Sequence, residues 1–181
     1  MGTYVNPGNI AFQEAVNSRI YIDKNELILY TNSILNTTQK NICVSRPRRF
    51  GKSMATEMLV AYYSKGCDSA KLFSGKKAEK DASFLTHLNH HNVIHLDIQQ
   101  FLESERDLDI FIKEIEYSVI EELMEVFPEC QGFDINSRLK TVLNKIFNQT
   151  NSGFIFIIDE WDCVFRLAKN QKDFQKEYLD F

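Results

Sequence analysis

The sequence has no apolar run long enough to span a membrane, and its first residues lack the basic segment and apolar run of a secretory signal. The formal net charge of −4 provides none of the positive excess that drives nonspecific nucleic-acid binding. No C-x-x-C spacing joins the four cysteines, which disfavours a metal or redox site at Cys43, Cys67, Cys130 and Cys163. These absences predict a cytoplasmic protein with reduced, packed thiols, no membrane partner and no indicated nucleic-acid partner.

The rest of the composition is that of an ordinary globular domain. Hydrophobic residues make up 44% of the 181 residues and charged residues 25%, which is enough to form a core. We therefore expect one domain over residues 1–181, with a lead-in of residues 1–40 and a nucleotide-binding core of residues 41–181. Residues 1–20 are expected to be irregular, and a short helix is expected to follow Lys24 and end near Leu35.

One short segment matches the second half of a phosphate-binding loop, whose pattern is G-x-x-x-x-G-K-[ST]. Gly51-Lys52-Ser53 fits that half, whereas Arg46 stands at the first glycine, where an extended conformation before Pro47 tolerates a side chain. Residues 41–44 predict a short buried strand, and residues 54–63 predict a helix with one apolar face. In a strand–loop–helix arrangement, backbone N–H groups converge on phosphate at the helix N-terminus.

The loop therefore predicts a site for ATP. Lys52 is expected to contact the β- and γ-phosphates, the alternative being a surface lysine at a helix start. Ser53 is expected to bind Mg²⁺, the alternative being a helix cap. Arg48 and Arg49 either add positive charge at the phosphates or face solvent. The residues expected to contact the nucleotide are Pro47, Arg48, Arg49, Phe50, Gly51, Lys52, Ser53 and Met54.

A second motif follows much later in the chain. Residues 154–158 are five consecutive apolar residues, β-branched and aromatic, which predict a fully buried parallel strand. Asp159 and Glu160 come directly after it, as in a Walker B motif. Asp159 is expected to hold Mg²⁺, directly or through water, and Glu160 to polarise the water that attacks the γ-phosphate. The alternative for Glu160 is a surface carboxylate at a strand end. Lys52 and Glu160 are thus the predicted catalytic residues.

The other periodic segments predict the fold class. A strand is expected at residues 93–98, and helices at about residues 106–127 and 137–147. Strands that alternate with helices predict an α/β fold, here a P-loop NTPase with a parallel sheet flanked by helices on both faces. Residues 175–181, at the end of the chain, have the pattern of the first turns of an amphipathic helix. We therefore expect the sheet to be truncated after the Asp159–Glu160 strand. His87 and His91 have a spacing that suits a metal, but their asparagine-rich surroundings favour a solvated loop.

With both motifs in hand, the chain resembles the bacterial AAA-ATPase-like family over essentially its whole length. Arginine in place of the first loop glycine is typical of that family, whereas Trp161 stands where its members more often have tyrosine. Members usually carry a PD-(D/E)xK nuclease-like domain after the ATPase domain, so the resemblance implies an N-terminal fragment whose partner is that missing domain or another copy of the chain. The matching segments are Tyr21-Ile22-Asp23-Lys24, Arg46-Pro47-Arg48-Arg49-Phe50-Gly51-Lys52-Ser53, Tyr62-Tyr63, Leu72-Phe73-Ser74-Gly75 and Asp159-Glu160-Trp161-Asp162.

The motifs together predict ATP binding, with Mg²⁺-dependent hydrolysis in the complete protein by in-line attack of water on the γ-phosphate. The alternative is a nucleotide-dependent switch or partner-binding module with little or no turnover, and a third possibility is a structural domain with an inactive loop. Glu160 favours hydrolysis, and Lys52 and Ser53 disfavour the third possibility. By itself the chain is expected to be a weak or inactive ATPase, because such folds often need an arginine finger.

Overall fold

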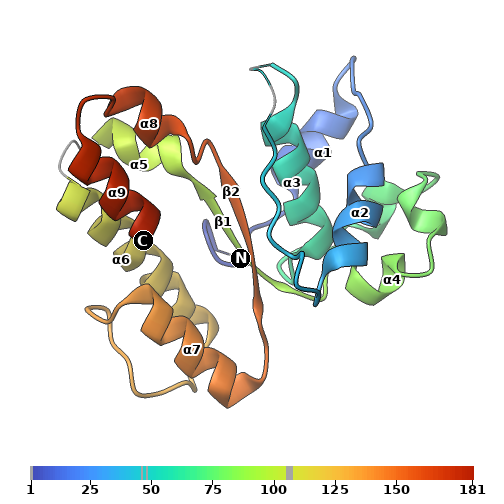
Figure 1. Ribbon diagram of the computed structural model, residues 1–181. Helices are drawn as coiled ribbons and strands as arrows, with labels where there is room; N and C mark the ends of the chain where they lie inside the picture. Colours follow the sequence, from blue (N-terminus) through green and yellow to red (C-terminus); the bar gives the residue numbers. More distant parts are fainter. Residues whose placement is uncertain (1, 46, 48, 105–107) are drawn as a thin grey trace. The chain divides into compact units, whose positions relative to one another are not determined.

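The computed structural model describes residues 2–45, 47, 49–104 and 108–181 (Figure 1). Their contacts divide the chain into two compact units, Met1–Val93 and Ile94–Phe181. The division does not test the expected single domain with a lead-in of residues 1–40, which stays a prediction. None of the described helices combines the length and hydropathy that a membrane crossing requires.

The first unit is built mainly from helices. The predicted helix after Lys24 is confirmed as α2, and the one at residues 54–63 is confirmed as part of α3, which begins at Lys52. The elements of this unit are α1 (Ile10–Asn17), α2 (Glu26–Ile34), α3 (Lys52–Tyr63), the 3₁₀ helices η1 (Ala70–Phe73) and η2 (Ala78–Lys80), and α4 (Phe84–His87).

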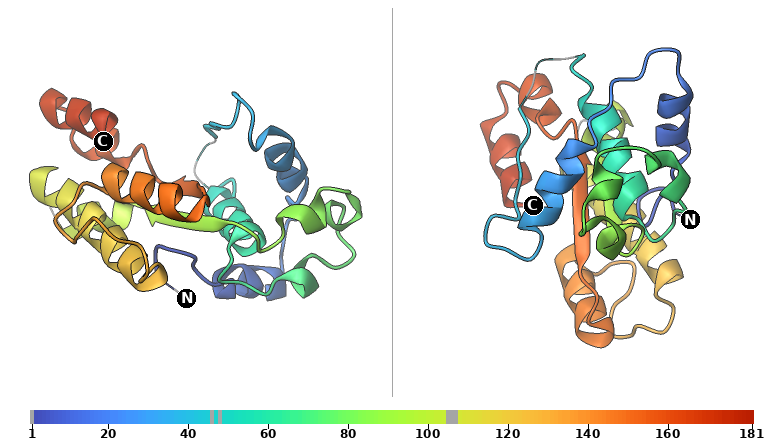
Figure 2. Two further views of the ribbon diagram at one scale, coloured as in Figure 1. Left: turned by 90° about the horizontal axis from the view of Figure 1, so that it is seen from below. Right: turned by 90° about the vertical axis from the view of Figure 1, so that its right-hand side faces the viewer.

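Helix α1 corrects the expectation that residues 1–20 are irregular. Phe12, which is buried, stacks on Phe73 with ring centroids 5.3 Å apart, and its ring edge meets Tyr21 at 6.2 Å. Helices α1 and α3 lie side by side (Figures 1 and 2). An eight-residue helix is marginal in isolation, so burial of its apolar side in this aromatic cluster, rather than its own sequence, stabilises it.

A buried polar network joins α2 to α3. Asn32 donates its amide N–H to the Tyr62 hydroxyl at 2.9 Å, and its carbonyl oxygen accepts a bond from the Tyr63 hydroxyl at 2.7 Å. The Tyr62 hydroxyl in turn donates to the backbone carbonyl of Phe84 at 2.8 Å. Because buried polar groups are costly to leave unpaired, this network fixes α3 in one position relative to α2. The fixed C-terminal half of α3 supports the loop at its N-terminus.

The predicted buried strand at residues 41–44 is wrong. The segment forms neither helix nor strand and is exposed, with Ile42 40% and Val44 48% accessible. A strand exists only where its backbone pairs with a neighbouring strand, and the named strands of the described residues pair with each other. Cys43 is consequently exposed rather than packed, whereas Cys163 is buried as expected.

The second unit holds the strand pair. The predicted strands at residues 93–98 and 154–158 are confirmed as β1 and β2, and the two later helices as α6 and α7. The predicted start of the first of these helices, near residue 106, lies outside the described residues. The elements are β1 (Asn92–Asp97), which begins in the first unit, α5 (Ile98–Ser104), α6 (Leu108–Val126), α7 (Leu139–Thr150), β2 (Phe154–Asp159), α8 (Cys163–Leu167) and α9 (Lys172–Asp180).

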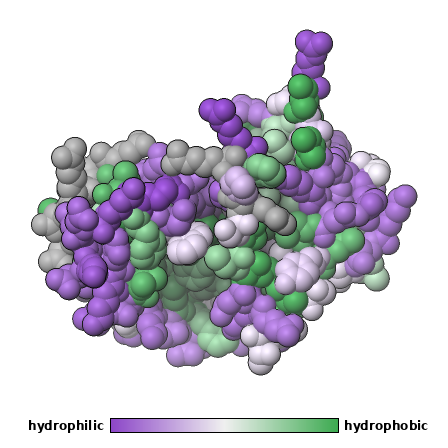
Figure 3. All heavy atoms as spheres, turned by 45° about the horizontal axis from the view of Figure 1, so that its top comes forward, coloured by the Kyte–Doolittle hydropathy of each residue, from purple (hydrophilic) through white to green (hydrophobic). Residues whose placement is uncertain are grey.

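The sheet confirms the fold class only in its coarse form, mixed α/β with parallel strands. Among the described residues the sheet consists of two neighbouring strands, β1 and β2, which run parallel (Figure 1). A larger P-loop sheet with helices on both faces remains a prediction. The expected full burial of β2 is wrong, because Ile157 and Asp159 are buried whereas Phe156 and Ile158 are each 44% exposed. Other hydrophobic residues also reach the surface, as the face in Figure 3 shows.

Candidate functional site

The loop before α3 has the backbone shape of an anion-binding turn. Gly51 adopts φ 72° and ψ 38°, and Arg49 also has a positive φ of 67°. Glycine tolerates this left-handed conformation without the steric cost that a β-carbon brings. The Gly51 carbonyl then accepts the first helical hydrogen bond, from the Ala55 N–H at 3.2 Å. The chain thus turns sharply at Gly51 and enters α3 directly at Lys52.

The predicted nucleotide-contacting residues surround this turn. Pro47, Arg49, Phe50 and Ser53 are exposed, whereas Gly51, Lys52 and Met54 are partly buried. Arg48 lies outside the described residues, as does Arg46. Lys52 and Ser53 are the first two residues of the 12-residue helix α3, and the N-terminus of a helix favours an anion through the helix dipole. The geometry of the loop therefore suits a phosphate group.

Lys24 contacts the loop before α3, although the loop motif does not include it. Its ammonium group donates to the backbone carbonyls of Phe50 and of Gly51, the second at 3.2 Å. The sequence does contain a signal, because Lys24 ends the Tyr21–Lys24 segment that matches the family. The contact itself joins Lys24 to Phe50, which lie 26 positions apart, and a local sequence pattern cannot predict such a pairing.

The second group of candidate residues lies at the end of β2. Asp159 is buried, and its carboxylate accepts a hydrogen bond from the Glu160 backbone N–H at 2.9 Å. Glu160 has a φ of 50°, a left-handed conformation that is unfavourable for a residue with a side chain. The chain therefore turns abruptly at the strand end, and the hydrogen bond to Asp159 supports that turn.

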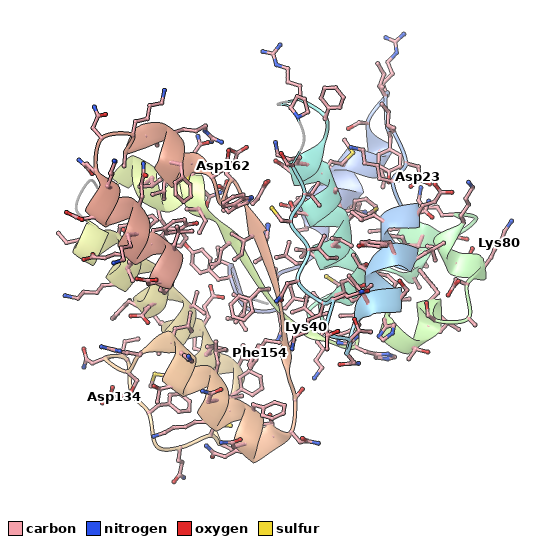
Figure 4. The ribbon with its side chains drawn as sticks, in the orientation of Figure 1. Asp23, Lys40, Lys80, Asp134, Phe154 and Asp162 are labelled. Carbon is pink, nitrogen blue, oxygen red and sulfur yellow. The ribbon has the colours of Figure 1, made fainter. Side chains whose placement is uncertain are left out.

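Arg166 holds both carboxylates that follow Asp159. Its guanidinium group lies 2.5 Å from the Glu160 carboxylate and 2.7 Å from that of Asp162. Asp162 lies at the start of α8 (Figure 4). Hydrogen bonding to Glu160, together with Asp162, raises the pKa of Arg166. Asp162 is therefore a partner of Arg166. Glu160 is consequently held in an ion pair.

Asp97 is a further carboxylate that the motif analysis missed. It ends β1, the parallel neighbour of β2, and the carboxyl ends of parallel strands meet at one edge of a sheet. Burial raises the pKa of Asp97, and the negative charges of Asp159 and Glu160 raise it further. The signal in the sequence was an aspartate at the penultimate position of the predicted strand at residues 93–98. Asp97 therefore lies close enough to Asp159 and Glu160 to sense their charges.

The histidines pair with each other. His87 Nδ1 and His91 Nε2 lie 2.9 Å apart, in hydrogen-bond contact. Within the part of the chain that the structure describes, no group of three or more His, Cys, Asp or Glu side chains is placed to hold a metal ion. Mg²⁺ is a separate case, because it retains several waters and commonly takes only one or two protein carboxylates.

The candidate residues thus form two sets. The structure brings Gly51, Lys52 and Ser53 together with Lys24 in the first unit, and Asp159 and Glu160 together with Arg166 in the second. A family model described as "Predicted AAA-ATPase" matches residues 10–181 and so covers both sets. No curated protein and no solved structure matches the chain.

Proposed function

Because the chain belongs to the predicted AAA-ATPase family, we propose that it binds ATP through the loop before α3 and hydrolyses it with Mg²⁺. The observation that carries the proposal is the left-handed turn at Gly51, which leads directly into a helix that begins with Lys52 and Ser53. Glycine at the turn allows close approach of a ligand to the backbone, and lysine brings a positive charge to the same helix end.

Each loop residue has a chemical role in this proposal. The backbone N–H groups at the start of α3 bind phosphate oxygens, and the Lys52 ammonium group neutralises their charge. Arg49 and Phe50 are exposed beside the turn, so they are available to a bound nucleotide. We assign Pro47 and Met54 to the edges of the same site, and the proposed contact of Arg48 rests on its place in the motif alone.

The hydrolytic step requires a cation and a base. Mg²⁺, when bound, neutralises negative charge on the phosphates, and Ser53 and Asp159 are the proposed oxygen ligands. A serine hydroxyl and a carboxylate match the oxygen preference of Mg²⁺. Glu160 accepts the proton of the attacking water, for which its carboxylate must first separate from Arg166. Each set of residues by itself therefore supplies the chemical groups that this step needs.

The ion pair between Glu160 and Arg166 also favours a second candidate function. While Glu160 is paired, its carboxylate is engaged by a guanidinium group and is a poor base. A protein in this state binds ATP without turning it over, as a nucleotide-dependent switch does. Phosphate release at saturating ATP distinguishes the two functions, because a switch releases almost none.

Calorimetric titration with ATP in the presence of Mg²⁺ tests the proposal. Lys52→Ala removes the charge at the phosphates, and charge-assisted hydrogen bonds contribute about 1.5–3 kcal/mol. We therefore expect ATP affinity to fall about tenfold or more in this variant.

Lys80→Ala is the matched control, because Lys80 is an exposed lysine of the same unit in η2 (Figure 4). It should bind ATP as the wild type does. Equal affinity in the wild type and Lys52→Ala, or no binding in the wild type, would show that the loop is not a nucleotide site.

A further inference from the structure

Lys24 makes an unusual contact, because a cationic side chain is directed at the backbone of the phosphate loop rather than at an acidic partner. Its Nζ donates to the carbonyls of Phe50 and Gly51, which belong to two consecutive peptide units. A β-carbon on Gly51 would lie only 2.8 Å from this Nζ, so the absence of a side chain at Gly51 gives Lys24 its access. The glycine of the motif and Lys24 are therefore sterically linked.

The contact has a consequence for the opposite side of the loop. A trans peptide unit is planar, and its C=O and N–H point in opposite directions. When Lys24 attracts the Phe50 and Gly51 carbonyls, the N–H groups of Gly51 and Lys52 in the same two peptide units face away from Lys24. Two successive N–H groups that face one way, beside a left-handed residue, form the concave arrangement that binds anions.

Lys24 is itself held firmly on both sides along the chain. The Asp23 carboxylate accepts hydrogen bonds from the Tyr21 hydroxyl at 3.3 Å and from the Asn25 N–H at 3.1 Å. The buried Asn25 side chain accepts a bond from the Ala78 N–H at 2.8 Å. These contacts fix the backbone from which the Lys24 side chain extends toward the loop.

We propose that Lys24 is a positioning residue that sets the phosphate loop in its anion-binding conformation before any ligand arrives. This inference rests on the proposed binding of ATP and adds a residue outside the motif to that site. Fixing the two peptide units in advance avoids the conformational entropy that the loop would otherwise lose when it binds phosphate. Lys24 also brings positive charge to the loop without being required to touch the nucleotide.

Three variants of the full chain test the role. Lys24→Met removes the ammonium group and keeps an unbranched side chain, whereas Lys24→Arg retains the charge and its donors. Lys76→Met is the matched control, because Lys76 contacts Asp23 and lies 4.7 Å above the Tyr21 ring on the same segment, with no contact to the loop among its described interactions. Urea unfolding establishes that each variant is folded and gives its stability.

The motion of the Gly51 and Lys52 backbone N–H groups is measured without ligand as NMR order parameters, and affinity for ATP in the presence of Mg²⁺ is measured by calorimetry. For Lys24→Met we expect both order parameters to fall from roughly 0.85, the value of a rigid backbone, toward about 0.6, because the two peptide units lose the group that holds their carbonyls. ATP affinity should fall about tenfold, the loss expected for one charge-assisted hydrogen bond. Lys24→Arg should restore both order parameters and bring the affinity to within about threefold of the wild type. Lys76→Met should leave the order parameters and the affinity unchanged even where it lowers the midpoint of urea unfolding.

The result that overturns this inference is equal order parameters and equal affinity in the wild type and Lys24→Met. An equal loss of affinity in Lys76→Met also overturns it, because the effect would then come from general destabilisation of the segment. Failure of the proposed function is a different result, namely that the wild type binds no ATP. In that case the order parameters of Gly51 and Lys52 alone decide whether Lys24 orders the loop.

Discussion

Glu160 combines a left-handed backbone conformation with an ion pair to Arg166. Residues that are held in such a conformation are concentrated at functional sites, because the surrounding structure must offset the strain. Here the hydrogen bond to Asp159 and the ion pair to Arg166 both act on Glu160. The residue that the sequence motif predicts as the base is therefore also held in a left-handed conformation by two contacts.

Glu160→Gln separates binding from hydrolysis. Glutamine has nearly the same shape as glutamate but cannot accept a proton, so we expect ATP affinity within about threefold of the wild type and single-turnover phosphate release lower by about 10²–10⁴-fold. Glu121→Gln, at an exposed position on α6, is the control and should leave both values unchanged. Unaltered phosphate release in Glu160→Gln would exclude Glu160 as the base.

Gly51 is a second residue at which backbone shape and contact act together. Gly51→Ala places a β-carbon on a residue with a positive φ and only 2.8 Å from Lys24 Nζ. Gly75→Ala is the control, because Gly75 has a similar φ of 76° but no atom lies within 4 Å of the added β-carbon. Both variants should lose about 1–2 kcal/mol of unfolding free energy from the left-handed conformation. Only Gly51→Ala should also weaken ATP binding, because it displaces Lys24. Equal affinities in the two variants would contradict the importance of that contact.

At the scale of the element, α1 shows how packing produces a helix that its sequence does not predict. The helix has no acidic residue in its first turn, no basic residue in its last turn and no side-chain cap. Its stability therefore depends on the burial of Phe12 against Phe73 and Tyr21. The Tyr21 contact is notable because it links α1 to the segment that positions Lys24.

Phe12→Ala tests this dependence. Removal of a buried phenylalanine side chain typically costs about 3–5 kcal/mol, so the free energy of unfolding should fall by that order in urea titrations followed by circular dichroism. Ile10→Ala, on the same helix but 68% exposed, should change it by less than about 0.5 kcal/mol. Equal effects of the two substitutions would show that α1 is stabilised by its own sequence instead.

At the scale of the whole molecule, the histidine pair His87 and His91 of the first unit should make the stability of the protein depend on pH. Burial lowers the pKa of His91 to about 4, with smaller contributions from the positive charges of His87, His90 and Lys65. Burial likewise lowers the pKa of His87. Since the ordinary pKa is 6.5, the unfolded chain takes up protons at His91 before the folded chain does.

The folded protein should therefore lose stability as the pH falls from about 6.5 through about 4, whereas above 6.5 both states are neutral at His91 and the stability is retained. We expect a loss on the order of 1–2 kcal/mol after allowance for solvent screening, measured by urea unfolding at several pH values. His91→Gln should flatten this dependence, and His90→Gln, at an exposed position, should not. An unchanged pH dependence in His91→Gln would mean that other groups cause it.

The sequence by itself determined the elements whose patterns are local. The apolar spacing at residues 54–63 and 137–147 gave helices that the structure confirms as parts of α3 and α7, because one turn of helix depends on residues three or four positions apart. The loop residues Gly51-Lys52-Ser53 and the pair Asp159-Glu160 were identified in the same way. Their positions at a helix start and a strand end follow from short-range backbone preferences.

Only the tertiary structure decided which distant groups meet and which faces are covered. The bond from Lys24 to Gly51 and the proximity of Asp97 to the charges of Asp159 and Glu160 join residues far apart in sequence. The exposure of Ile158 and of residues 41–44 depends on whether a neighbouring strand or helix covers them, and a run of apolar residues carries no information about its neighbours. Long-range contacts result from the packing of the whole chain, so local patterns cannot specify them.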